Sequence, residues 1–193
     1  EHVDKLDKIT SIGQNAFKGC TALKSIGSLH NLETIGQGAF SGCSALEHVD
    51  DLYSLTRLES GAFAHCASLV SVDCSDKLTA IGSSAFFGCK ALVSIGDLSN
   101  VTSIESSVFR GCIALKSIGN MPKLESIGMQ CFMGCTALET VGDLSSLKEI
   151  PSETFDGCTS LVSIGDLSNV TIIGSYGFNQ CKKLTSIPNL GSL

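Results

Sequence analysis

Hydrophobic residues recur along this chain with a period of 23 residues. Phenylalanine shows the period most directly, because it recurs every 23 residues from Phe17 to Phe178 and only Phe87 lies outside the series. A Cys follows each of these Phe residues by three positions, a Leu follows the Cys by three, and an Ile or Val follows the Leu by three. A branched residue also precedes each Phe by five positions, from Ile12 to Ile173. Eight such units without an insertion or deletion predict a solenoid in which each unit stacks on the previous one.

The spacing inside a unit predicts short extended segments. Between Leu23 and Ile35 an apolar residue occurs at every third position, which fits neither a helix nor a long strand. We expect one strand near Lys24–Ser28, a second near Glu33–Gly36, and a turn with a short helical or 3₁₀ segment over each G-x-x-A-F-x-G-C stretch. The predicted class is an α/β leucine-rich-repeat solenoid, mostly β and coil, with parallel strands about 4.8 Å apart.

Composition narrows the classes of function. The chain has 193 residues, 43% hydrophobic, and a net charge of −6, which argues against a nucleic-acid or anionic-membrane surface. No apolar run reaches the roughly 20 residues of a membrane span. We expect a single domain over residues 1–193. Glu1–Asp4 repeats Glu47–Asp50 and Leu193 aligns with Val170, so both ends fall within a unit and we expect an uncapped stretch of a longer array.

The string I-G-x-x-A-F-x-G-C-x-x-L-x-S-I resembles the BspA-like, or Treponema pallidum-type, leucine-rich repeats over essentially the whole chain. The resemblance implies a curved right-handed solenoid of a surface protein, with roles in adhesion to host or matrix proteins, to other cells, and in self-association. It brings no catalytic motif. The strand exit departs from the family, because S-I-G-D-L-S replaces I-x-I-P. Only Val72-Asp73-Cys74 keeps the two-residue spacing, so we expect Cys74 in the core.

The repeat pattern predicts a non-enzymatic scaffold, and the resemblance implies that it lies at the cell surface or outside the cell. We expect no catalytic residue, cofactor or metal site. The expected partners are a protein, matrix or glycan ligand, with self-association as a further option, and without nucleic acid or membrane insertion. The alternative is a structural subunit of a self-assembling surface layer or filament, and an intracellular scaffold is a third interpretation.

Eight of the ten cysteines form one column, which favours buried free thiols that fill the same space in each turn. Disulfides between neighbouring turns are sterically feasible, since stacked Cα atoms lie about 5 Å apart. Zinc is disfavoured, because no C-x-x-C pair is present and the histidines do not accompany the cysteines. Cys131 replaces the Ala that usually precedes Phe, so we expect it in the core too.

One repeat position forms an acidic and amide-bearing stripe that Ser28 and Cys74 interrupt. Its members are Asp51, Asp97, Asn120, Asp143, Asp166 and Asn189. Such a row can hold cations or meet a basic partner. The interpretation that we favour is that these side chains cap backbone N–H groups at the bend after the strand, as Asp and Asn do well.

A second position forms a hydroxyl stripe, which we expect on the outer side of the first strand. Its members are Ser25, Ser71, Ser94, Ser117, Thr140, Ser163 and Ser186, with His48 as the exception. Small hydroxyls make a flat surface able to bind glycans, a protein or an identical solenoid. The same residues could equally serve only to keep the outer face of a parallel sheet soluble, and the sequence leaves both interpretations open.

Two N-glycosylation sequons begin at Asn100 and Asn169. They carry glycans only in a secreted eukaryotic protein, and here they belong to a duplicated ten-residue stretch, Val93–Thr102 and Val162–Thr171. The exposed aromatic candidates are Tyr53, Phe87 and Tyr176. Their small number favours binding over a broad polar surface rather than through an aromatic hot spot.

Overall fold

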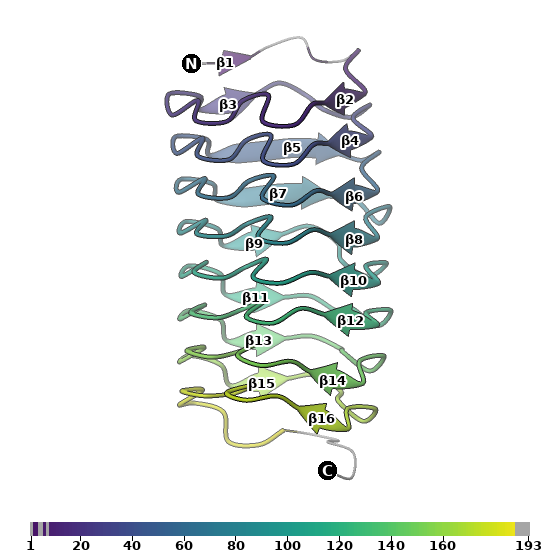
Figure 1. The fold of residues 1–193 in the computed structure, drawn as a ribbon, viewed down its shortest axis with the longest axis vertical. Coiled ribbons are helices and arrows are strands. Elements are labelled where there is room, and N and C mark those ends of the chain that lie inside the picture. Colours follow the sequence, from purple (N-terminus) through teal and green to yellow (C-terminus); the bar gives the residue numbers. More distant parts are fainter. Residues whose placement is uncertain (1, 4–5, 7, 188–193) are drawn as a thin grey trace.

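The computed structural model describes residues 2–3, 6 and 8–187, which form a parallel β-solenoid with two strands in each turn (Figure 1). The first strand of each unit belongs to one series: β1 (His2–Val3), β3 (Ser25–Ile26), β5 (His48–Leu52), β7 (Ser71–Cys74), β9 (Ser94–Ile95), β11 (Ser117–Ile118), β13 (Thr140–Val141) and β15 (Ser163–Ile164). The second belongs to another: β2 (Ser11–Ile12), β4 (Thr34–Ile35), β6 (Arg57–Leu58), β8 (Ala80–Ile81), β10 (Ser103–Ile104), β12 (Ser126–Ile127), β14 (Glu149–Ile150) and β16 (Ile172–Ile173). The two predicted extended segments are therefore confirmed.

Each series pairs in parallel with the equivalent strands of neighbouring units. The first forms the sheets β1-β3-β5-β7-β9 and β11-β13-β15, and the second forms β2-β4-β6-β8-β10-β12 and β14-β16. Each strand residue pairs with the equivalent residue of the next unit, as Ser117 does with Thr140. The first series is therefore interrupted between β9 and β11, and the second between β12 and β14.

The G-x-x-A-F-x-G-C stretch differs from its prediction. It forms turns, and the described residues contain strands and turns but no helix, so the class is mostly β rather than α/β. The physical reason is that two residues of this stretch take left-handed φ angles in each unit, as Asn15 (56°) and Gly19 (74°) do in the first complete one. A right-handed helix cannot continue through such residues.

Backbone hydrogen bonds explain how these turns stack. The N–H groups of Asn15, Phe17 and Gly19 donate to carbonyls of the next unit, over 2.7–2.9 Å. The N–H groups between them close turns within the unit, as Lys18 does to the carbonyl of Asn15. Every second N–H therefore links one unit to the next, and the turn side of the solenoid is held by a ladder of its own.

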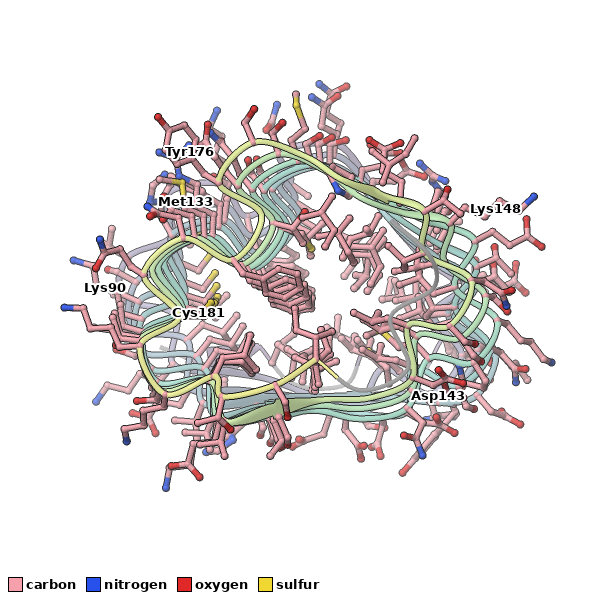
Figure 2. The ribbon with its side chains drawn as sticks, turned by 90° about the horizontal axis from the view of Figure 1, so that it is seen from below. Lys90, Met133, Asp143, Lys148, Tyr176 and Cys181 are labelled. Atoms are coloured by element: carbon pink, nitrogen blue, oxygen red, sulfur yellow. The ribbon has the colours of Figure 1, made fainter. Side chains whose placement is uncertain are left out.

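The core consists of columns of identical side chains that run along the solenoid axis. Phe40, Phe63, Phe86, Phe109, Phe132 and Phe155 are fully buried. Successive rings lie 5.2–5.6 Å apart and within 8° of parallel. The view along the axis shows the side chains superposed inside the coil (Figure 2). Single units could not bury these rings, so stacking is the source of the fold's stability.

The cysteine column lies beside the phenylalanine column, with thiols that are buried in the middle and more exposed at Cys20 and Cys181. Each thiol of this column from Cys43 to Cys181 donates a hydrogen bond to the carbonyl of the Phe one unit back, such as Cys112 Sγ to Phe86 O at 3.2 Å. All ten cysteines are free thiols in this structure. Cys74 and Cys131 are buried, as predicted.

Candidate functional site

The hydroxyl stripe lies on the outer face of the first strand series. Its members from Ser94 to Ser186 are exposed, whereas Ser25 and Ser71 are half-buried. On β11, β13 and β15 the exposed Ser or Thr alternates with a buried Ile or Val. Glycines 119, 142 and 165 follow the buried residue, and the exposed Lys116, Glu139 and Val162 directly precede the stripe. The stripe itself is flat and offers hydroxyls and backbone.

The acidic stripe mostly caps backbone. Asp97, Asp143 and Asp166 each accept a hydrogen bond from the N–H two residues later, over 2.8–2.9 Å. The amide oxygen of Asn120 accepts from the N–H of Asp143 at 3.0 Å. These carboxylates therefore fold the bend after the strand, and Asn189 lies outside the described residues. Within the described part of the chain, no three His, Cys, Asp or Glu side chains are placed to hold a metal ion.

Asp51 differs from its equivalents because β5 contains a bulge. Val49 pairs with Val72 and Leu52 with Cys74, so Asp50 and Asp51 lie opposite the single residue Asp73. Asp51 has a φ of 63° and accepts a hydrogen bond from the hydroxyl of Ser28 at 2.7 Å.

The bulge gathers carboxylates around an exposed aromatic ring. Asp50 and Asp73 are exposed, and Tyr53 is 49% exposed. A hydrogen bond with Asp51 and the charges of Asp73 and Asp50 raise the pKa of the Tyr53 hydroxyl. We refer to Asp50, Asp51, Tyr53 and Asp73 as the acidic bulge.

The sequon asparagines hold the corner between the two strand series. The amide nitrogen of Asn100 donates to the carbonyl of Asp76 at 2.8 Å, and that of Asn169 to the carbonyl of Ser145 at 2.7 Å. Asn100 is half-buried and Asn169 is exposed. Each side chain thus joins one unit to the previous one.

A shallow hollow on the turn side was not predicted. It is lined by His65, Phe87, Lys90, Arg110, Ile113 and Met133, with Gly88, Gly111 and Gly134 as its floor. The three glycines lack side chains, so a trough remains between the residues on its two sides. We refer to the six side chains as the basic–apolar patch.

Ring and charge contacts fix the centre of this patch. The ring of His65 lies edge-on to Phe87 at 5.0 Å between centroids, and the Arg110 guanidinium lies 5.8 Å from the centroid of the same ring. Arg110 Nη1 also donates to Gln130 Oε1 at 2.8 Å. Ile113 is 47% exposed beside them.

No carboxylate lines the hollow. Among the described residues, the two ion pairs both involve Arg57, which contacts Glu59 and Glu105 on the second strand series at 3.0 and 2.9 Å. Lys90 and Arg110 thus have no acidic partner within the described chain. The sequence does carry a signal for the patch, because one repeat position holds Phe87, Arg110 and Met133 in the three middle units. The same position holds small or polar residues in the others: Lys18, Ser41, Ala64, Asp156 and Asn179.

No helix in the described part of the chain has the length and apolar character of a membrane span.

Solved structures of several bacterial leucine-rich-repeat proteins are similar to this chain. The solved structure of a leucine-rich cell surface protein from Faecalibacterium prausnitzii is 26% identical, with a TM-score of 0.70 over 96% of this chain and 59% of that one. A leucine-rich repeat protein from Bacteroides ovatus is also 26% identical, with a TM-score of 0.66 over 92% of this chain and 57% of that one. This chain therefore spans little more than half the length of either protein.

The leucine-rich repeat protein of T. pallidum shares the fold, with 24% identity and a TM-score of 0.66 over 96% of this chain and 78% of that one. No curated protein matches the sequence. A family profile for the BspA type leucine-rich repeat region matches residues 1–116 and 92–192, together nearly the whole chain. The chain therefore belongs to the family of BspA-type leucine-rich repeat regions.

Proposed function

We propose that this chain is a non-enzymatic protein-interaction scaffold of the cell surface or extracellular space, and that it binds its ligand with the outer face of the first strand series. The observation that carries the proposal is the flat row of exposed hydroxyls from Ser94 to Ser163 with glycines beside it. Such a row can form hydrogen bonds to a protein or glycan over several units, since the same small hydroxyl recurs in each of them.

The location is supported by one relative. The F. prausnitzii protein is described as a cell surface protein, and the similarity to it covers 96% of this chain. The stacked core adds to the proposal, because a surface built on repeated units is rigid and a ligand that spans several units loses little entropy in ordering it.

Substitution of arginine on this face tests the proposal. We would expose the chain to a glycan array and to purified extracellular-matrix proteins, and then repeat the assay with Ser117→Arg plus Ser163→Arg. Each arginine places a long charged side chain on the flat face, so we expect capture to fall by at least tenfold. Ser11→Arg plus Ser126→Arg is the matched control, because both serines are exposed on the outer face of the second series.

Capture that is lost only with the first pair supports this face. Equal capture by both pairs would refute it, and absence of capture by the unmodified chain from either source would refute the choice of ligand class. Circular dichroism and thermal melting of each variant show that the solenoid itself is unchanged.

A further inference from the structure

We infer that the basic–apolar patch binds the acidic bulge of a second copy of this chain, so that copies associate side by side in open rows. The inference concerns surfaces other than the hydroxyl stripe and does not depend on the proposed function. It follows from the chemistry of two places where the repeat pattern is broken.

Charge is the first argument. The patch presents Lys90 and Arg110 and no carboxylate on a chain whose net charge is −6. The bulge gathers Asp50, Asp51 and Asp73 on two adjacent strands. The two surfaces are therefore opposite in sign, and each lacks the counter-charge that the other carries.

Apolar complementarity is the second argument. Ile113 and Met133 border a trough whose floor of glycines leaves room for a side chain. Tyr53 is a half-exposed aromatic ring in the middle of the bulge. An aromatic side chain inserted beside Ile113 and Phe87 would be buried. Buried aromatic and apolar side chains are typical of the centre of a protein interface.

The charges extend over a similar length of the solenoid axis. Asp50 and Asp73 occupy one repeat position in consecutive units, whereas Lys90 and Arg110 belong to consecutive units at different repeat positions. Consecutive units of a parallel ladder lie about 4.8 Å apart, so each pair spans about one such step along the axis.

The position of the two surfaces makes the association open. Lys90 lies on one side of the cross-section, whereas Asp143, which occupies the repeat position of Asp51, lies on the opposite side (Figure 2). A contact between two different surfaces on opposite sides leaves one of each free after every addition. Such a heterologous contact forms rows rather than closed dimers.

Two charge-reversed variants test the pairing. Lys90→Glu plus Arg110→Glu removes the patch and keeps the bulge, and Asp50→Lys plus Asp73→Lys does the reverse. Sedimentation velocity at rising concentration should show an increasing sedimentation coefficient for the unmodified chain, and this increase should be lost in about 0.5 M salt because exposed charges are then screened. Each variant alone should stay monomeric.

The decisive sample is the equimolar mixture of the two variants. The intact bulge of the first meets the intact patch of the second, and the reversed patch and reversed bulge are also opposite in charge, so the mixture should associate although neither variant does so alone. Lys182→Glu plus Lys183→Glu is the control, since it makes the same change of charge at exposed lysines beyond the patch and should associate like the unmodified chain.

Several results would overturn the inference. They are a concentration-independent monomer for the unmodified chain, association that persists in either variant alone, and a mixture that remains monomeric while both variants are folded by circular dichroism. Association lost only on reversal of the patch would instead assign the patch to another occupant.

Discussion

At the residue scale, two positions in each unit have a left-handed backbone, and they differ in the side chains that they accept. The later position is Gly in most units, as at Gly111. The earlier one holds Ser84, Ser107, Gln130 and Glu153 with φ between 57° and 60°. There the side chains bond along the column: Gln130 Nε2 donates to Glu153 Oε2 at 2.8 Å. Such bonds offset part of the strain that a side chain suffers at positive φ.

A glycine substitution pair separates backbone strain from packing. An added Cβ at Gly111 would meet nothing closer than 3.9 Å, so Gly111→Ala should cost only the left-handed strain, about 1 kcal/mol. At Gly128 the Cβ would collide with the backbone nitrogen of Ser106, so Gly128→Ala should cost clearly more. Urea denaturation measures both, and equal losses would contradict this distinction.

The thiol column gives a second prediction at this scale. Cys112 is fully buried and its thiol donates to the Phe86 carbonyl. In Cys112→Ser the Cβ–O bond is shorter than the Cβ–S bond that it replaces, and the buried hydroxyl is more polar than the thiol. We therefore expect a loss of about 1–2 kcal/mol in the free energy of unfolding. Cys20→Ser, at an exposed site of the same column, should change stability by less than about 0.5 kcal/mol. A similar loss at both sites would show that the hydrogen bond and burial are unimportant.

At the scale of the element, the unit of stability is the column rather than the strand. The strands are mostly two residues long, too short to hold a sheet by their own hydrogen bonds. The offset rings of the phenylalanine column bury far more apolar surface than these short strands do, and ring stacking adds to the stability from that burial. Adjacent units are therefore coupled mainly through core side chains and through the turn-side ladder.

The stability lost on removal of one ring should consequently depend on the place of that ring in the column. Phe109 is fully buried between Phe86 and Phe132, so Phe109→Ala should cost about 3–5 kcal/mol. Phe178 is half-buried and stacks on Phe155, so Phe178→Ala should cost less and unfold mainly the neighbouring unit. Hydrogen exchange resolves the two cases, and identical exchange patterns would argue against local coupling.

At the scale of the whole molecule, the buried thiols make stability depend on alkaline pH. Burial raises the pKa of Cys43 from 9.0 to about 11 and that of Cys74 to about 12. Burial also raises the pKa of Cys66, Cys112, Cys131 and Cys158. Unfolding therefore releases protons above pH 9, because the thiols ionise in the unfolded chain first.

The stability contributed by these thiols is complete below pH 9 and is lost as the pH rises toward their folded pKa values. Each fully buried thiol should lower the free energy of unfolding by about 1.4 kcal/mol per pH unit above 9. Denaturant midpoints between pH 7 and pH 11 check this, with Cys74→Ala as the variant that should show a shallower fall. A midpoint constant across this range would contradict the burial of neutral thiols.

The sequence by itself determined the period, the core columns and the identity of both strand series. This was possible because each position recurs in every unit, so that residues such as Phe63 and Cys66 reveal an inward side by repetition alone. The departures Cys74 and Cys131 could be assigned for the same reason. The capping role favoured for Asp97 follows from local chemistry, which needs only two neighbouring residues.

The tertiary structure decided what lies between the columns. The left-handed positions turned an expected helical segment into turns, because φ is fixed by hydrogen bonds to the next unit and not by local propensity. The bulge at Asp50 and Asp51 arises only when units with different strand exits are paired. Phe87, Arg110 and Ile113 likewise form one patch only after stacking brings residues about 23 positions apart side by side, which no single unit of sequence specifies.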